Sequence, residues 1–190
     1  MNKFREYKHT PTRTYTKKHR NYRDYKPFLE KDFKGRCGYT NCSQFWFGGR
    51  NNFHIDHFIP WKKNSTNPEL KTDYNNLVYC CSYVNILKSD NEGPFLDPCN
   101  VDYNDHFGRN SDGGIYPKTE QARFMYNKLK LYFPRYKIIW QLDRMKEKMT
   151  ELEDLKSIKT SNVKLKKINK LLEELRTMFT KYTDYLECVQ

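Results

Sequence analysis

The residues of this chain best suited to chemistry lie between positions 53 and 90 of a sequence of 190 residues. Asp56 and His57 are adjacent in the run FHIDHFIP, Asn76 precedes the apolar run LVYCC, and Asn85 follows it. A hard divalent cation prefers oxygen ligands, so the carboxylate of Asp56 and the amide oxygen of Asn85 are candidate metal ligands. Such a cation neutralises charge on a phosphate, while a histidine that titrates near neutral pH removes a proton from water. These residue types predict phosphodiester hydrolysis, with His57 as general base and Asn76 orienting the ring of His57.

Two short strands and a helix are expected to position these side chains. Residues 53–60 mix apolar and polar types and end at a proline, which is typical of a strand that closes into a loop. The apolar run 77–81 is typical of a buried strand, and Ser82 is a suitable N-cap for a helix over residues 83–89. The turn-rich segment 61–72 connects the two strands. We therefore expect a compact β–β–α unit.

The strand that carries the candidate base raises a geometric question. Neighbouring residues on a regular strand point to opposite faces, so Asp56 and His57 share one site only where the strand bends or ends. His54 and Asp56 are the pair that share a face. Pro60, three residues after His57, allows the strand to end there, so both arrangements stay open.

The joint pattern resembles the HNH (ββα-metal) nuclease family. The family core is Asp-His followed by an apolar residue and often proline, then Asn before an apolar run, then His or Asn on a helix with Lys three residues later. This sequence has Asp56-His57-Phe58-Ile59-Pro60, Asn76-Leu77-Val78, and Asn85 with Lys88. The resemblance implies that Asp56 and Asn85 hold a catalytic divalent ion, Mg²⁺ or Mn²⁺. It also implies that His57 activates water, that Asn76 positions His57, and that the strand brings Asp56 and His57 to one site.

The cysteines offer a second, structural metal site. Many HNH proteins staple the fold with zinc through two Cys-x-x-Cys pairs, and here each pair lacks one cysteine while Cys37 and Cys81 keep the other. Cys42 and Cys80 lie nearby and offer substitutes. Structural Zn²⁺ on these four cysteines therefore stays open beside the alternative that they are buried apolar thiols.

The charge of the chain is unevenly distributed along its length. Of the net charge of +12, residues 1–36 carry +8, residues 37–117 carry −3 and residues 118–190 carry +7. Basic segments favour polyanionic partners, so we expect a nucleic acid, DNA first with RNA as the alternative. Residues 1–25 alternate Lys and Arg with Tyr, Thr and His. They are expected to be either an arm that follows a nucleic-acid backbone or an ordinary flexible terminus.

The sequence shows no feature of a membrane or secreted protein. The first residues, MNKFREYKHT, lack the apolar core of a signal peptide. No apolar run approaches the ~20 residues that span a bilayer. We therefore expect a cytoplasmic protein without membrane contact, in a reducing compartment that disfavours disulfides.

The segment after the expected helix adds a further resemblance. It contains GPFLDPCNVDYNDHF and then DGGIYPKTEQARFMYNKLKL, which place Leu-Asp-Pro, then Asp-Tyr, then His-Phe before Gly-x-x-Pro and a helix. Over residues 26–135 this is similar to the HNH proteins of the retron and Septu type of antiphage defence. The resemblance implies a nuclease effector that an ATPase partner restrains or directs. His106 in this stretch is expected either to approach the metal site or to be a structural histidine.

Residues 118–190 are expected to be helical, with a first helix over residues 119–131. Beyond it, apolar residues recur at threes and fours in two stretches separated by the polar residues 159–162. The stripes are Ile138, Leu142, Met145, Met149, Leu152 and Leu155, and then Leu165, Ile168, Leu172, Leu175, Phe179, Tyr182 and Leu186. This spacing predicts an antiparallel helical hairpin. The hairpin either covers the core or docks a partner or a second copy of the chain.

Together, these patterns predict an α+β protein with a ββα-metal (HNH) core, surrounding helices and a C-terminal antiparallel helical hairpin. Its expected parts are a basic arm (1–25), a nuclease core (26–117) and a helical extension (118–190). The expected function is metal-dependent endonucleolytic cleavage of DNA by the effector of a bacterial antiphage defence system. The alternatives are an RNA-cleaving nuclease, a non-catalytic nucleic-acid-binding subunit, and an interaction module built on the C-terminal helices.

Overall fold

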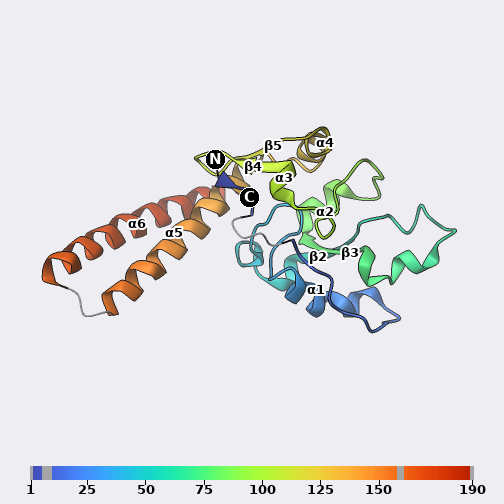
Figure 1. The fold of residues 1–190 in the computed structure, drawn as a ribbon, viewed down its shortest axis with the longest axis horizontal. Helices are drawn as coiled ribbons and strands as arrows, with labels where there is room; N and C mark the ends of the chain where they lie inside the picture. The colour runs from blue at the N-terminus through green and yellow to red at the C-terminus, as the bar shows by residue number, and fades with distance from the viewer. Residues whose placement is uncertain (1, 6–9, 158–160, 189–190) are drawn as a thin grey trace. The chain divides into compact units, whose positions relative to one another are not determined.

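The computed structural model describes residues 2–5, 10–157 and 161–188, and it divides into two compact units, Met1–Tyr132 and Phe133–Gln190 (Figure 1). The described elements of the first unit are β1 (Asn2–Lys3), α1 (Lys26–Asp32), β2 (Phe53–His57), β3 (Leu77–Cys81), α2 (Ser82–Lys88), α3 (Tyr103–His106), β4 (Phe107–Arg109), β5 (Ile115–Pro117) and α4 (Glu120–Lys128). The second unit consists of α5 (Pro134–Ser157) and α6 (Asn162–Cys188). This mixture of helices and short strands confirms the predicted α+β class. In the described part of the chain, none of the helices combines the length and apolar character needed to cross a bilayer.

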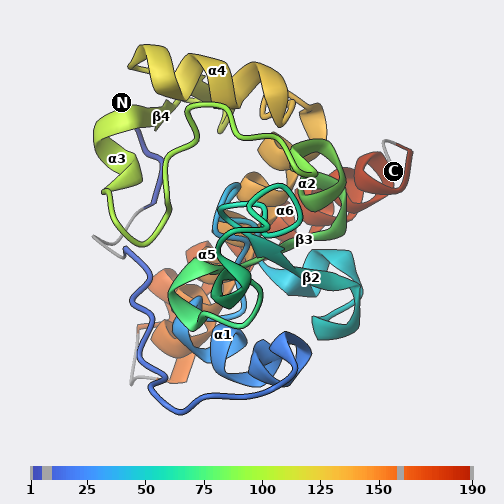
Figure 2. The same cartoon turned by 90° about the vertical axis from the view of Figure 1, so that its right-hand side faces the viewer.

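A two-stranded antiparallel sheet, β2 with β3, carries most of the candidate site. Its register pairs Phe53 with Cys81 and His57 with Leu77, and every residue of β3 is buried. Helices α1 and α2 both pack against this sheet (Figure 2). The three elements β2, β3 and α2 follow one another in the expected order, because the apolar run of β3 passes directly into the helix.

The boundaries of α2 differ slightly from those expected. Ser82 is its first helical residue rather than its N-cap, and Cys81 occupies the cap position without a side-chain hydrogen bond. The helix ends at Lys88, since Ser89 has a φ of +48° and turns the chain away. Strand β2 ends at His57, and the segment from there to β3 contains short 3₁₀ turns at Pro68–Lys71 and Tyr74–Asn76.

A second small sheet, in the order β1–β4–β5, joins the first described residues to the middle of the chain. Arg109 on β4 is buried, and its guanidinium donates to the carbonyls of Phe4 (3.3 Å), Thr40 (3.2 Å) and Gly113 (2.8 Å). The backbone N–H of Arg5 donates to Asn104 Oδ1 at 2.9 Å. One buried guanidinium thus connects three segments that are far apart in sequence.

The described part of the expected basic arm is anchored to the first unit. Arg13 forms a buried ion pair with Asp97 (3.0 Å) and donates to the carbonyl of Leu77 (2.9 Å). Thr14 donates through its backbone N–H and its hydroxyl to Asp32, both at 2.7 Å. Residues 1 and 6–9 of the expected arm lie outside the described residues. Where it is described, the arm is held by specific contacts rather than left as a free terminus.

The second unit is a helical hairpin, as the spacing of its apolar residues predicts. Helices α5 and α6 pack along one another, and Arg176 on α6 forms an ion pair with Glu153 on α5 (2.6 Å) (Figure 1). Leu152 on α5 and Leu172 and Leu186 on α6 are buried members of the expected stripes. Residues 159 and 160 of the expected polar break lie outside the described residues. Helix α4, expected with the helical extension, lies in the first unit.

Candidate active site

The imidazole of His57 lies at the end of β2 in a defined orientation. Its Nε2 is 2.9 Å from the carbonyl oxygen of Lys71. A carbonyl only accepts hydrogen bonds, so Nε2 carries the proton and Nδ1 keeps its lone pair. The ring packs edge-on against Tyr22, with ring centroids 4.8 Å apart, and against Trp61 at 6.3 Å. The ring is therefore held in this orientation by two segments, the loop before β3 and the N-terminal segment.

The surroundings of His57 favour its neutral form. Burial is the main cause that lowers the pKa of His57, and the positive charges of Lys88 and Lys71 act in the same direction. The hydrogen bond to the Lys71 carbonyl and the negative charge of Asp56 oppose this shift, but the net pKa lies below the ordinary histidine value. A neutral imidazole with a free Nδ1 is the state that a general base requires.

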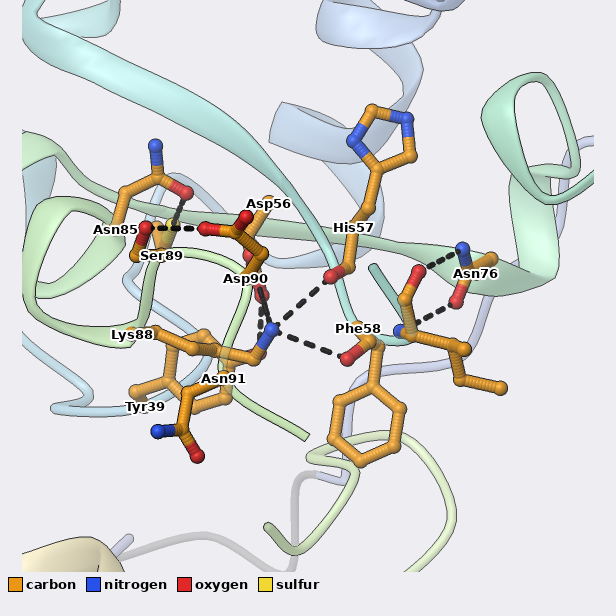
Figure 3. Close-up of polar contacts among 12 residues, drawn as sticks. Tyr39, Asp56, His57, Phe58, Asn76, Asn85, Lys88, Ser89, Asp90 and Asn91 are labelled. Carbon is orange, nitrogen blue, oxygen red and sulfur yellow. Dashed lines mark hydrogen bonds and ion pairs between the residues drawn. The ribbon is translucent and has the colours of Figure 1, made fainter. Parts of the chain in front are cut away.

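Asp56 is buried and fully engaged by two other side chains (Figure 3). The hydroxyl of Tyr39 donates to Oδ2 at 2.6 Å, and Nζ of Lys88 lies 3.2 Å from Oδ1 and 3.1 Å from Oδ2. Burial and the charge of Asp56 raise the pKa of Tyr39, so the phenol keeps the proton that it donates. Lys88 has no exposed surface and also donates to the carbonyls of His57 and Phe58, both at 3.0 Å.

Asp56 and His57 consequently face opposite sides of the strand. The pairing of β2 with β3 stays regular through both residues, so their side chains alternate. Figure 3 shows the carboxylate of Asp56 directed toward the amine of Lys88, while the ring of His57 points away from that amine. The bend that would bring Asp56 and His57 to one site does not occur before β2 ends.

Asn76 is hydrogen-bonded to backbone groups near His57 rather than to the ring of His57. Its Oδ1 accepts from the N–H of Ile59 (2.8 Å), and its Nδ2 donates to the carbonyls of Ile59 (2.9 Å) and Leu70 (2.9 Å). Ile59 lies two residues after His57, and Leu70 is the neighbour of Lys71, whose carbonyl holds the imidazole. The buried amide therefore fixes both chain segments that set the direction of the ring.

We expect replacement of Asn76 by alanine to lower the free energy of unfolding by about 2–3 kcal/mol. The substitution leaves the N–H and carbonyl of Ile59 and the carbonyl of Leu70 without their partner, and each orphaned buried group costs roughly 1–3 kcal/mol before relaxation. Urea unfolding followed by circular dichroism measures the change. Asn75→Ala, one residue earlier and exposed, is the matched control, with an expected effect within about 0.5 kcal/mol. Equal effects of the two substitutions would show that the hydrogen bonds of the Asn76 side chain do not contribute to the free energy of unfolding.

Asn85 on α2 faces His54 and a cavity. Its Nδ2 lies 3.3 Å from Nδ1 of His54, and the thiol of Cys80 lies 3.9 Å from its Oδ1. The cavity has a volume of about 350 Å³ and is lined by Tyr22, Arg23, Lys26, Phe53, His54, Ile55 and Asn85. Of the predicted site residues, the structure thus groups Asn85 with His54, whereas Asp56 lies with Lys88.

Residues 35–90 match the HNH endonuclease family model. The matched segment contains β2, β3 and α2 together with all four predicted site residues. An HNH segment indicates a nuclease. No curated protein and no solved structure matches the chain.

The HNH segment as it lies does not fit a divalent ion between Asp56 and Asn85. A hard cation needs oxygen lone pairs and uncompensated negative charge, but the oxygens of Asp56 accept from Tyr39 and Lys88, and the ammonium of Lys88 balances the charge. The amide of Asn85 faces His54 instead. Within residues 2–5, 10–157 and 161–188, no three His, Cys, Asp or Glu side chains are grouped closely enough to hold an ion.

Each of the four cysteines considered for zinc has a partner within the HNH segment. All four are buried. The thiol of Cys42 lies 3.9 Å from the carbonyl of Thr40, and the thiol of Cys80 lies 3.9 Å from the carbonyl of His54. The thiols of Cys37 and Cys81 are hydrogen-bonded to each other. This arrangement fits the buried-thiol alternative, in which each sulfur contributes to local packing.

Two contributors to the site are not evident from sequence. Lys71 acts through its backbone carbonyl, which any residue type would supply, so no sequence signal marks it. Tyr39 lies in the segment RCGYTNC, where the cysteines attract attention, and its bond to Asp56 spans 17 positions. His106, the residue with two expected roles, is structural in kind: its Nδ1 is 3.0 Å from the hydroxyl of Thr119, the N-cap of α4.

Proposed function

We propose that this protein is an HNH-type endonuclease that hydrolyses phosphodiester bonds in DNA, with His57 as the general base. The observation that carries the proposal is the state of His57, held by the Lys71 carbonyl with an unprotonated Nδ1 and a lowered pKa, inside the HNH segment. The net charge of +12 supports a nucleic-acid substrate. Asn76 and Tyr22 act as positioning residues, the first through the backbone and the second through ring packing.

The chemical step assigned to this chain is proton removal from water. Nδ1 of His57 takes one proton as the water oxygen forms a bond to phosphorus, and the bond from phosphorus to the leaving oxygen breaks with its electron pair. The imidazolium then returns its proton to solvent, and the leaving oxygen is protonated by water. A divalent ion in HNH nucleases supplies charge neutralisation at the phosphate. Asp56, which is engaged by Tyr39 and Lys88, does not fit as a ligand of such an ion here.

A role in defence extends the proposal. The motifs that resemble retron and Septu HNH proteins support an antiphage effector that works with an ATPase partner. One of these motifs has a clear structural use, since Asp97 of Leu-Asp-Pro forms the buried ion pair with Arg13. The α5–α6 hairpin is the proposed docking element for that partner or for a second copy of the chain.

A non-catalytic nucleic-acid-binding subunit is the second candidate, and one observation favours it. The pairing of Asp56 with Lys88 withdraws the carboxylate that HNH chemistry would use for an ion. In that case the protein binds DNA with a steep dependence on salt and shows no turnover in any divalent ion.

One assay separates the two candidates. Purified protein is incubated with supercoiled plasmid and, separately, with transfer RNA, each in Mg²⁺, in Mn²⁺ and in EDTA. We expect conversion of plasmid to nicked and linear forms, with transfer RNA left intact. Cleavage of transfer RNA alone would replace DNA by RNA as the substrate. A plasmid that stays supercoiled under every condition, while still being bound, would establish the binding subunit and reject the nuclease.

A further inference from the structure

The cavity beside β2 is built from four elements of the first unit. Tyr22 and Arg23 come from the short 3₁₀ turn Tyr22–Tyr25, and Lys26 is the first residue of α1. His54 comes from β2 and Asn85 from α2. Its volume of about 350 Å³ lies within the range of small-ligand sites, roughly 300–1,000 Å³.

Positive charges converge at this cavity without matching negative charges. Neither Arg23 nor Lys26 has a carboxylate within ion-pair distance among the residues that the structure describes. Burial lowers the pKa of Lys26, and the charge of Arg50 lowers it further, with Glu30 opposing. The carboxylate of Glu30 is itself engaged by Arg50 at 3.3 Å and by the amide of Gln44. A bound anion lowers the repulsion between like charges that are held close together in this way.

The neutral groups of the cavity complete a binding site for oxyanions. Asn85 presents amide N–H donors beside the ring of His54. Arginine and lysine supply charge-assisted hydrogen bonds to phosphate, and an amide adds a neutral donor. Tyr22 lines the cavity and packs against the ring of His57. A group bound here is therefore separated from the proposed base by one side chain.

We propose that the cavity binds a phosphate group of the nucleic-acid backbone, adjacent in the strand to the phosphate that His57 hydrolyses. Arg23 and Lys26 neutralise the phosphate, and Asn85 donates to it. The proposal rests on the proposed nuclease function for the identity of the ligand, but its test needs no turnover. In this proposal the N-terminal segment holds the nucleic-acid strand across β2.

Two measurements in EDTA test the proposal on the full chain. In the first, inorganic phosphate is titrated into labelled protein, and nuclear magnetic resonance follows the backbone amides of residues 22–26 and the side-chain amide of Asn85. We expect saturable shifts at these positions. In the second, the affinity for a single-stranded oligonucleotide is measured as a function of salt concentration for wild type, for Arg23→Gln/Lys26→Gln, and for single variants.

The salt dependence distinguishes the cavity from general surface charge. Each phosphate neutralised on a single strand contributes about 0.7 to the slope of log affinity against log salt, and the cavity holds one phosphate, so the double variant should lose about 0.7. Lys26→Gln alone should lose a part of this. Lys31→Gln, an exposed lysine on the same helix, removes the same charge away from the cavity and should leave the slope unchanged.

Specific outcomes would overturn the proposal. Lys31→Gln and Lys26→Gln giving equal slopes, or phosphate causing no shifts at residues 22–26 and Asn85, would reject the site. Inorganic phosphate could shift the amide resonances while the salt slope for the oligonucleotide stays unchanged in the double variant. That result would assign the cavity to free phosphate and reject binding of a nucleic-acid phosphate there. A protein that fails the plasmid assay but shows both expected results loses the nuclease function and keeps the phosphate site.

Discussion

Replacement of His57 by alanine should slow plasmid cleavage by about 10²–10⁴-fold, the usual contribution of a positioned general base. The ring is half-buried at the end of β2 and is hydrogen-bonded to the Lys71 carbonyl. Its removal should therefore cost little stability. His57→Asn is a sharper variant, because its amide can still donate to that carbonyl but cannot accept a proton. Both variants should bind plasmid like wild type, and nicking at an unchanged rate by either would refute the role of His57.

The pH dependence of cleavage gives an independent check on the same residue. Burial lowers the pKa of His57, so the neutral, proton-accepting form already predominates at pH 7 and is lost as pH falls through the lowered pKa. The charges that act on the ring are those of Lys71, Lys88 and Asp56, of which Asp56 alone raises the pKa. The acidic limb of the rate profile should lie below the ordinary histidine value of about 6.5. A limb above that value, or one that persists in His57→Asn, would point to another group.

Replacement of Lys88 by methionine should lower the free energy of unfolding by about 3–5 kcal/mol, the expected cost of breaking a buried ion pair. Methionine fills a similar volume but leaves the carboxylate of Asp56 buried without its counter-charge. It also leaves the carbonyls of His57 and Phe58 without a donor. Urea unfolding measures the loss, and Lys63→Met, at an exposed position, controls for the change of residue type with an expected effect within about 0.5 kcal/mol.

A double-mutant cycle tests whether the loss comes from the pair. Asp56→Asn removes the charge that Lys88→Met leaves unpaired, so the two substitutions together should cost less than the sum of their separate effects. Additive effects would mean that Asp56 and Lys88 contribute independently. A further discriminator is Mg²⁺, because a ligand that binds only the folded state raises stability. If Asp56 were an ion ligand, Mg²⁺ should stabilise the wild type and not Asp56→Asn.

The order and type of the central elements could be predicted from sequence because hydrophobic patterning specifies them. The local signals are the apolar run of β3, the residues that mark the start and end of α2, and the heptad-like stripes of α5 and α6. The structure contains the corresponding elements. The first residue of α2 could not be predicted from sequence. Whether Ser82 caps α2 or begins it depends on backbone angles that serine permits in both positions.

The partners of the site residues could not be predicted because they depend on contacts across the chain. An aspartate suits an ion and a lysine equally well, and 32 positions separate Asp56 from Lys88. One signal was available: Val84 and Lys88 are four residues apart on α2, so a helix that buries Val84 also buries Lys88. A buried lysine requires a counter-charge, and Asp56 supplies it. Residue type alone therefore indicated a chemical capacity, and topology decided its use.

The hydrogen bonds from Arg109 to Phe4 and from Arg5 to Asn104 affect the order in which the first unit folds. These hydrogen bonds close loops of 105 and 99 positions. A growing polypeptide cannot form them until translation has passed that point, so β1 waits unpaired while the HNH segment is already complete. Long-range closures of this kind slow folding. The sheet that contains β1 should accordingly be among the last parts of the newborn molecule to settle.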